Sequence, residues 1–175
     1  MAYVYYPDLY FTTASIFKKQ HLLKSIEAKQ MLLDTFQFLS DQDRVTIFGF
    51  AIMSNHFHII WQINDETPLS KIQHSLLSFT SKELMVLIEN SGMILDDFLV
   101  RKSDRMHQIW NDRPLSIPLT YDKIIQQKLN YTHSNPVAAK LVTLPEKYFF
   151  SSCRSYIENK PQWPFLTLWR SANLL

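Results

Sequence analysis

Residues 45–63 read VTIFGFAIMSNHFHIIWQI, two apolar runs that meet at Ser54-Asn55. Such runs predict two short strands, and the two-residue loop predicts a hairpin, in which Asn55 tolerates a positive φ. Side chains alternate between the two faces of a strand, so His56 and His58 point to the same face. The opposite face is apolar and is expected to join the core, with Phe57, Ile59, Trp61 and Ile63.

Two imidazoles on one strand face are a candidate metal site, because imidazole suits several divalent metals. A pair of ordinary half-exposed histidines is the alternative, since His-x-His alone is a weak motif. A zinc hydrolase built on His56 and His58 would need a third and a fourth ligand, and the sequence offers no obvious ones nearby. The partners of the pair are therefore expected elsewhere in the chain.

The composition is typical of a globular protein, with 46% hydrophobic and 19% charged residues in a chain of 175 residues. This length suits a single domain over residues 1–175. Cys153 is the only cysteine, which excludes an intramolecular disulfide and a cysteine-based zinc site. No apolar run has the length of a bilayer span, and the N-terminus lacks the pattern of a signal peptide. We therefore expect a cytoplasmic protein with no membrane partner.

The elements around the central hairpin favour a ferredoxin-like fold of the α+β class. A strand is predicted over residues 9–14 and an amphipathic helix over 15–39, broken near its start. A second amphipathic helix is predicted over 68–89. Strand, helix, two strands, helix, strand builds one antiparallel sheet with both helices on one face. The two histidines would then project from the other, open face.

The segment 93–118, which should contain the last strand, is the hardest to interpret. Residues 98–100 and 107–110 are its two candidate strands. A net charge of +2 permits nucleic-acid binding through a local patch without requiring it. The basic cluster in this segment is equally well explained as a solvated loop. The candidates for contact with DNA phosphates are Arg101, Lys102, Arg105, Arg113, Lys128 and Lys140.

A third, C-terminal helix is predicted over residues 120–135 and carries a candidate nucleophile. Pro136 is expected to end it, because the residue before a proline avoids helical geometry. Tyr131 lies one turn from Asn135 and one turn from Gln127, so the three share a stripe. A different stripe is expected to pack against the protein, with Tyr121, Ile125, Leu129 and Thr132.

Two motifs in this order resemble the single-tyrosine HUH transposases, and among them the REP-associated tyrosine transposases. The first is Met53-Ser54-Asn55-His56-Phe57-His58, and the second is Tyr131-x-x-x-Asn135-Pro136-Val137. Pro145-x-x-Tyr148 and Ser151-Ser152 match the tail of that branch, so the resemblance spans roughly residues 9–156. Two departures stand out: Ser54 replaces a common proline, and Ala138-Ala139-Lys140 replaces the usual Arg-Ala-Gly.

The resemblance implies a DNA strand transferase in which Tyr131 is the nucleophile. It also implies Mg²⁺ or Mn²⁺ bound by His56, His58 and one amide, for which Asn135 and Gln127 both remain open. An ordinary phenol has a pKa of about 10, so it needs a cation that polarises the phosphate. Attack would give a covalent phosphotyrosine and a free 3′-hydroxyl, which allows strands to be rejoined without ATP. Imidazole ligands favour manganese over magnesium.

The implied partner is single-stranded DNA near a hairpin, which places the protein at the bacterial nucleoid when bound. The aromatic segments 148–150 and 163–169 are expected to pack, and their apolar surface favours a homodimer. Whether the tyrosine helix would serve its own histidines or those of a second copy stays open. The alternative function is a non-catalytic ferredoxin-like module that binds nucleic acid. Such modules stack bases on exposed sheet aromatics, whereas Phe57 and Trp61 are expected to point away from the histidine face.

Overall fold

The stretch 45–63 forms the predicted β-hairpin. Strand β2 (Val45–Ile52) pairs antiparallel with β3 (His56–Ile63). The Met53 N–H donates to the His56 carbonyl over 2.8 Å, which leaves Ser54 and Asn55 as the loop. The computed structural model describes residues 6–64, 66–91, 98–102 and 105–170.

Asn55, which tolerates a positive φ, does not adopt one in this loop. The carbonyls of Ser54 and Asn55 accept hydrogen bonds of 2.8 Å from the N–H groups of Leu23 and Ile16, respectively. Contacts from outside the hairpin therefore fix this turn, and the intrinsic preference of the two loop residues does not decide its shape.

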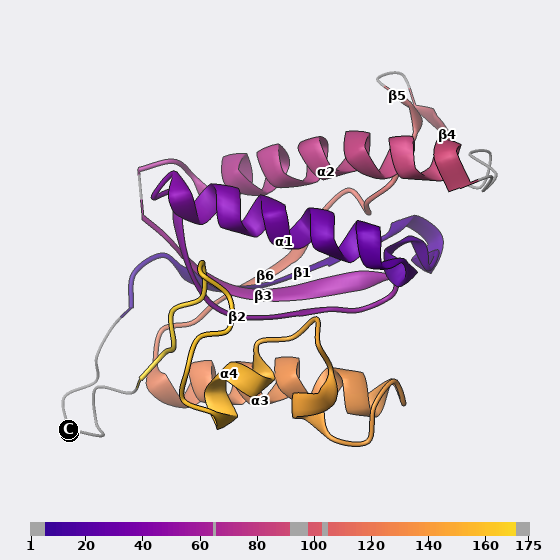
Figure 1. Ribbon diagram of the computed structural model, residues 1–175. Coiled ribbons are helices and arrows are strands. Elements are labelled where there is room, and N and C mark those ends of the chain that lie inside the picture. The colour runs from indigo at the N-terminus through magenta and orange to yellow at the C-terminus, as the bar shows by residue number, and fades with distance from the viewer. Residues whose placement is uncertain (1–5, 65, 92–97, 103–104, 171–175) are drawn as a thin grey trace.

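Four antiparallel strands form the sheet in the order β2-β3-β1-β6 (Figure 1). The predicted first strand is confirmed as β1 (Leu9–Ser15), which pairs with β3 on one side and with β6 (Leu115–Pro118) on the other. The sequence prediction missed β6, because its run LSIP is short and ends on a proline. Proline is tolerated in an edge strand, which is the position that β6 occupies.

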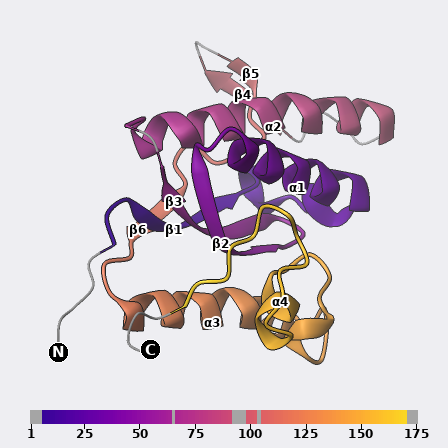
Figure 2. The same cartoon turned by 60° about the vertical axis from the view of Figure 1, so that its left-hand side comes forward.

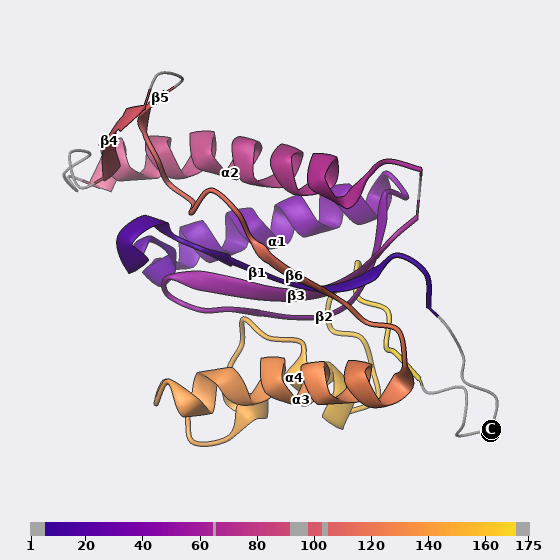
Figure 3. The same ribbon diagram turned by 180° about the vertical axis from the view of Figure 1, so that it is seen from behind.

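Of the two strands proposed within 93–118, residues 98–100 overlap β4 (Leu99–Lys102), whereas 107–110 overlap β5 (Arg105–His107) only at His107, and neither strand joins this sheet. β4 and β5 pair with each other in a separate two-stranded sheet. This small hairpin sits at the C-terminal end of helix α2 (Leu69–Ser91), on the side of the main sheet that α2 covers (Figures 1 and 3).

Helices α1 (Ile26–Asp41) and α2 lie side by side on one face of the sheet (Figures 1 and 2). The predicted break near the start of the first helix is confirmed, since two 3-10 turns precede α1: η1 (Phe17–Lys19) and η2 (Leu22–Lys24). Ser25 then caps α1, its Oγ accepting from the Ala28 N–H over 3.1 Å.

The apolar face of β3 forms the core beneath these helices, as the alternation predicts. Phe57, Ile59 and Trp61 are each fully buried, in one cluster with side chains of α1 and α2. The Phe36 ring of α1 meets the Phe57 ring edge to face at 5.6 Å. His56 and His58 therefore lie on the opposite face, where the sequence places them.

That opposite face is covered, which corrects the expectation of an open sheet surface. Helix α3 (Asp122–Ala138) and the short α4 (Cys153–Ile157) pack on it (Figures 1 and 2). Ile125 and Leu129 of α3 are buried in a second core cluster with Phe11 and other residues of the sheet. Of the predicted packing stripe only Tyr121 departs, since it is 44% exposed.

Gly49 permits the close approach of α3. A Cβ atom at this position would lie 2.7 Å from Leu129 Cδ2, a distance at which one of the two would have to move. The residue also sits beside an irregularity in the pairing of β2 with β3, between Ile47 and Gly49. Absence of a side chain here lets the tyrosine helix lie directly on the sheet.

Pro136 lies inside α3, so the predicted end of that helix is wrong. Proline removes one helical hydrogen bond, but the packed helix continues for two residues to Ala138. The end is a Schellman motif: the Lys140 N–H donates to the Val137 carbonyl and the Leu141 N–H to the Pro136 carbonyl, both over 2.9 Å. Lys140 takes a left-handed φ of 57° at the position that favours glycine.

We predict that Lys140→Gly raises the free energy of unfolding by about 1 kcal/mol, because a left-handed backbone strains residues that carry a Cβ atom. The midpoint of urea unfolding measures this. Ala139→Gly is the matched control: Ala139 has a φ of −80°, so glycine there should lower stability. A midpoint that does not rise in Lys140→Gly would contradict the prediction.

The C-terminal aromatic segments pack, as expected, and protect the outer edge of β2. The Ile52 N–H donates to the Phe150 carbonyl and the Thr167 N–H to the Ile47 carbonyl, both over 2.9 Å. The Phe50 ring meets the Trp163 ring edge to face at 5.8 Å. This return of the chain across β2 also places η4 (Pro145–Lys147) and α4 beside α3.

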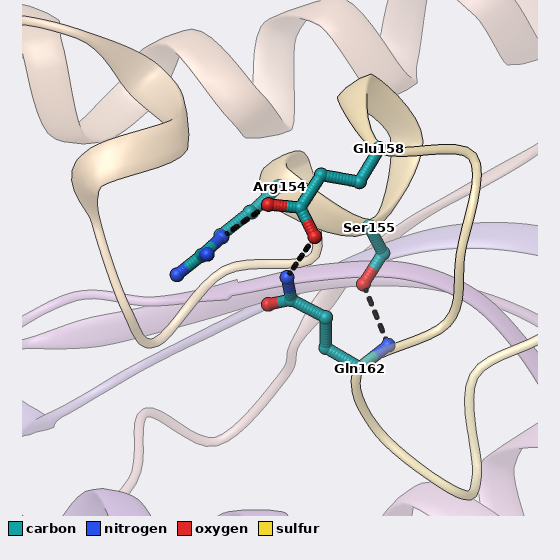
Figure 4. Close-up of polar contacts among 4 residues, drawn as sticks. All are labelled: Arg154, Ser155, Glu158 and Gln162. Atoms are coloured by element: carbon teal, nitrogen blue, oxygen red, sulfur yellow. Dashed lines mark hydrogen bonds and ion pairs between the residues drawn. The ribbon is translucent and has the colours of Figure 1, made fainter.

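A small polar cluster orders the segment that follows α4 (Figure 4). The Glu158 carboxylate accepts from Arg154 Nε over 2.7 Å and from Gln162 Nε2 over 2.9 Å. The Gln162 backbone N–H donates to Ser155 Oγ over 3.0 Å. The ion pair is exposed and adds little stability, so its effect is to orient the chain.

Across the described part of the chain, no helix is long and apolar enough to cross a membrane.

Candidate active site

Strand β3 and helix α3 bring the predicted site residues together. The His56 and His58 rings lie 4.8 Å apart, centroid to centroid, on the strand face that α3 covers. Asn135 of α3 reaches this strand, with its Nδ2 atom 3.1 Å from His58 Nε2. The two motifs that are distant in the sequence are therefore in direct contact.

Each histidine is oriented through its Nδ1 atom. His56 Nδ1 lies 2.6 Å from Asn55 Oδ1, and His58 Nδ1 lies 2.7 Å from Thr13 Oγ1. An amide oxygen only accepts, so Asn55 fixes the proton of His56 on Nδ1. Asn135 Nδ2 only donates, so His58 accepts at Nε2 and donates from Nδ1 to Thr13. Both rings thus carry a lone pair on Nε2.

Burial keeps the two imidazoles neutral. His58 is 3% exposed, and desolvation together with the nearby His56 and Lys128 lowers the pKa of His58 to about 3. Desolvation also lowers the pKa of His56, against a hydrogen bond with Asn135 that raises it. Neutral imidazole is the form that binds metal, so the lone pairs stay available at neutral pH.

Tyr131 stands at the mouth of this site. Its ring lies 5.3 Å from the His58 ring and 5.9 Å from the Phe11 ring, and the residue is 48% exposed. Lys128, one turn earlier on α3, places its Nζ atom 5.5 Å from the centre of the Tyr131 ring. The phenol is therefore packed on one side and open to a large substrate on the other.

The structure favours Asn135 over Gln127 as the amide near the histidines. Gln127 is exposed, and no hydrogen bond to either imidazole is found for it among the described residues. Asn135 contacts His58 and influences the pKa of His56. Both lie one turn from Tyr131, but among the described residues only Asn135 bonds a histidine of β3.

The predicted DNA-contacting residues are spread over the surface. Lys128 belongs to the site, and Lys140 follows the C-terminal end of α3. Arg113 lies on the far side of the main sheet, in a cleft beside α2. Arg101, Lys102 and Arg105 belong to β4 and β5 (Figure 1), so their backbone is remote from the site. Their roles stay predictions.

Sequence reasoning missed Thr13 and the ring of Phe11. Thr13 pairs directly with His58 across β1 and β3, and Phe11 stacks on the His58 ring at 5.3 Å. The alternation of LYFTTA places Phe11 and Thr13 on one face. Their partner strand could not be read from the sequence, so neither residue could be assigned to the site.

His133 of α3 has a structural role. It is buried, with Nε2 2.8 Å from Ser152 Oγ, and burial lowers the pKa of His133 to about 4. Ser152 Oγ also accepts from the Phe50 N–H over 2.9 Å. This network joins α3 to β2 and thereby holds the tyrosine helix on the sheet.

The donor atoms of the site fit a divalent cation. Across the described residues no group of three His, Cys, Asp or Glu side chains could hold a metal, so two histidines need an amide as third protein ligand. Asn135 is in place for this, because turning its amide would present Oδ1 where Nδ2 now lies. Asn55 and Thr13 are the outer partners that ligating histidines normally have.

Residues 8–92 match the family described as IS200-like transposase. The match runs from the start of β1 to the end of α2 and includes His56 and His58. This stretch, just under half of the chain, is similar to the IS200-like transposases. Tyr131 and Asn135 lie outside the matched residues, so their roles rest on the geometry of α3.

Solved structures support the same fold. A REP-associated tyrosine transposase bound to a REP hairpin has a TM-score of 0.60 and 17% identity, covering 97% of this chain and 90% of that chain. This likeness shows that the two share a fold. A Deinococcus radiodurans protein described as a transposase has a TM-score of 0.47 and 12% identity, covering 71% and 90% of the two chains, and supports no conclusion. Among curated protein sequences none matches this chain.

Proposed function

We propose that this protein is a metal-dependent single-strand DNA endonuclease and strand transferase that forms a 5′-phosphotyrosine at Tyr131. The contact between Asn135 and His58, 77 positions apart in the sequence, carries the proposal. It brings the turn of α3 that bears the exposed phenol onto the strand that bears the two histidines. A candidate nucleophile and candidate metal ligands are thereby held in one place.

The proposed reaction is a transesterification. The Tyr131 oxygen forms a bond to phosphorus and loses its proton to water, while the bond from phosphorus to the 3′ oxygen breaks. The leaving oxygen takes up a proton as a free 3′-hydroxyl, and the DNA on the other side of the cut stays on the tyrosine through its 5′-phosphate. Attack of a 3′-hydroxyl on the phosphotyrosine reverses these steps and rejoins strands. Lys128, close to the phenol ring, would neutralise charge on the phosphate.

The proposed cofactor is Mg²⁺ or Mn²⁺, with His56, His58 and Asn135 as protein ligands. A bound cation supplies neutralisation of the phosphate charge. The protein residues orient the donors: Asn55 and Thr13 hold the imidazoles with Nε2 unprotonated. Two nitrogen donors with an amide oxygen favour Mn²⁺ over Mg²⁺. Gln127 stays the rival third ligand, although its exposure makes Asn135 the better candidate.

The proposed substrate is single-stranded DNA next to a hairpin. The transposase of similar fold is bound to a REP hairpin, which supports extending that substrate class to this chain. The order of helices and strands and the strand order of the sheet also support a ferredoxin-like unit with the tyrosine helix added to it. We place the protein in the bacterial cytoplasm, where such DNA occurs.

The alternative, a non-catalytic ferredoxin-like module that stacks bases on the sheet, is disfavoured by burial. Phe57 and Trp61 are fully buried beneath the helices, and α3 covers the other sheet face.

Adduct formation distinguishes the strand transferase from the non-catalytic module. Labelled hairpin oligonucleotides with single-stranded tails are incubated with protein and Mn²⁺, then denatured. A protein–DNA adduct that a chelator prevents supports the transferase, and DNA binding without adduct supports the module.

A homodimer is also part of the proposal. Phe149, Ile157 and Leu141 are 66%, 64% and 47% exposed, all in or near the segment after α3. Exposed apolar side chains of this size favour a contact with a second copy. We predict a dimer mass in light scattering at micromolar concentration, reduced by Phe149→Ser but unchanged by Phe38→Ser on the opposite layer. A single-chain mass for the wild type would remove the dimer from the proposal.

A further inference from the structure

A polar cleft lies on the other side of the sheet from Tyr131. It runs between one side of α2 and the segment 107–114, and its volume is about 830 Å³. Its walls combine apolar groups, including Leu77 and Met85, with the cationic side chains of Lys82 and Arg113. A volume of this order suits a small ligand or part of a chain. Nothing in the proposed reaction uses this cleft.

The floor of the cleft contains an unpaired polar atom. Gln108 is 4% exposed, and its Nε2 donates to the Trp110 carbonyl over 3.0 Å. Its Oε1 is buried and accepts no hydrogen bond from the described residues. Trp110 is fixed from below, since its Nε1 donates to Thr80 Oγ1 of α2 over 3.0 Å. The Gln108 Oε1 atom has no exposed surface, so it lies beneath the surface of the floor and out of reach of a ligand in the cleft, whereas the bonded Trp110 gives the cleft a fixed floor.

The cleft is connected to the active site through short links. The Asn111 N–H donates to the Ser15 carbonyl over 2.9 Å, and Ser15 pairs with His56 across β1 and β3. Four residues later, Leu115 pairs with Thr13, which binds His58. The segment that forms one wall of the cleft therefore leads into the edge strand β6, which is separated from the histidine strand β3 by β1 alone. A DNA strand leaving the site over this edge would enter the cleft.

Charge distinguishes this cleft from a second cavity, which lies between α1 and α2. That cavity has a volume of about 730 Å³ and is lined by the carboxylates of Glu27, Asp34 and Glu83, with no Lys or Arg. The cleft has Lys82 and Arg113 against one carboxylate, Asp112. It also continues into β5, which belongs to the hairpin with Arg101, Lys102 and Arg105. A polyanion is therefore expected in the cleft and excluded from the second cavity.

We propose that this cleft binds the unpaired nucleotides that flank the cleaved phosphate of the DNA. Lys82 and Arg113 contact backbone phosphates, and Leu77 and Met85 contact base faces. The inference rests on the proposed function for its substrate but assigns a site outside the catalytic residues. The cleft would make the single-stranded flank, rather than the hairpin stem, a determinant of affinity.

The test measures fluorescence anisotropy of two labelled probes, a hairpin oligonucleotide with a single-stranded tail and the same hairpin without it. Every protein carries Tyr131→Phe to prevent cleavage. Lys82→Ala/Arg113→Ala should weaken binding of the tailed probe roughly tenfold and leave the hairpin without a tail unchanged. The slope of the logarithm of the binding constant against the logarithm of salt concentration should also become shallower by about 1.4. Each of the two lost phosphate contacts accounts for ~0.7 of this change. Lys71→Ala/Lys160→Ala, which removes two exposed lysines outside the cleft, should bind like the parent.

The proposal would be overturned if Lys82→Ala/Arg113→Ala and the lysine control bound the tailed probe with equal affinity. It would also be overturned if the cleft variant lost equal affinity for both probes, or if the parent protein bound neither probe. Thermal unfolding checks that the variants, whose changed side chains are exposed, stay folded. Adduct formation by the wild-type chain on the tailed probe is scored separately. Tail-dependent binding without an adduct would reject the proposed chemistry and keep the cleft. An adduct formed by the wild type, together with normal binding of the tailed probe by the cleft variant, would support the proposed chemistry and reject the cleft.

Discussion

Tyr131→Phe is expected to abolish the covalent protein–DNA adduct, with a loss on the order of 10³-fold or more. The change removes only the hydroxyl, and the described residues form no hydrogen bond with it that the fold would lose. The ring contacts with His58 and Phe11, at 5.3 and 5.9 Å, remain available to phenylalanine. DNA binding should stay within about twofold, because phosphates and bases are bound by other groups.

The measurement is the fraction of labelled oligonucleotide that remains on the protein after denaturation, with Mn²⁺ present. Tyr121→Phe is the matched control, since Tyr121 is 44% exposed and precedes the same helix. It should form the adduct at the wild-type rate. Mass spectrometry of the wild-type adduct should place the nucleotide on the peptide that contains Tyr131. An adduct of undiminished yield in Tyr131→Phe would show that another residue is the nucleophile.

The parts of the site that the sequence predicts are those set by local periodicity. Alternation along β3 places His56 and His58 on one face and Phe57 and Trp61 on the other, and burial confirms it. Helical spacing places Ile125 and Leu129 on the packing stripe and leaves Tyr131 outside it, which is also confirmed. These inferences need only the geometry of one strand or one helix.

The parts that the sequence could not predict depend on which segments meet. Asn135 and Gln127 are equivalent by spacing, each one turn from Tyr131. The choice between them depends on the direction in which α3 crosses β3, and that direction is set by distant contacts such as Leu129 against Gly49. Thr13 faces the same limit, because its role follows from the register between β1 and β3.

One sequence rule failed where packing outweighed local preference. Pro136 does not end α3, because Thr132 and His133 are buried before it and the Leu141 N–H closes the Schellman motif after it. Asn55 does not use its tolerance of a positive φ, because the loop carbonyls are bound from outside the hairpin. In each case a tertiary contact fixes a backbone that an isolated peptide would arrange differently.

Removal of the histidine donors is expected to abolish metal-dependent cleavage, but the choice of variant matters. The sequence alone suggests that alanine at both positions leaves the fold intact. Burial of His58, stacked on Phe11 and bonded to Thr13 and Asn135, makes His58→Ala costly by about 2–4 kcal/mol. His58→Gln keeps a polar side chain of similar reach between Thr13 and Asn135. His56→Ala/His58→Gln is therefore the informative variant.

This variant should lose adduct formation at least about 100-fold, because the phosphate charge is no longer neutralised by a held cation. Isothermal titration with Mn²⁺ should show one site per chain in the wild type and none in the variant.

Asn135→Ala should weaken Mn²⁺ binding, while Gln127→Ala, one turn on the other side of Tyr131, should not. His21→Gln controls for removal of an exposed histidine, since its Nδ1 bonds only the loop hydroxyl of Ser54 among the described residues. Wild-type Mn²⁺ binding and adduct yield in His56→Ala/His58→Gln would exclude the metal site, and activation of Tyr131 would then have to come from Lys128.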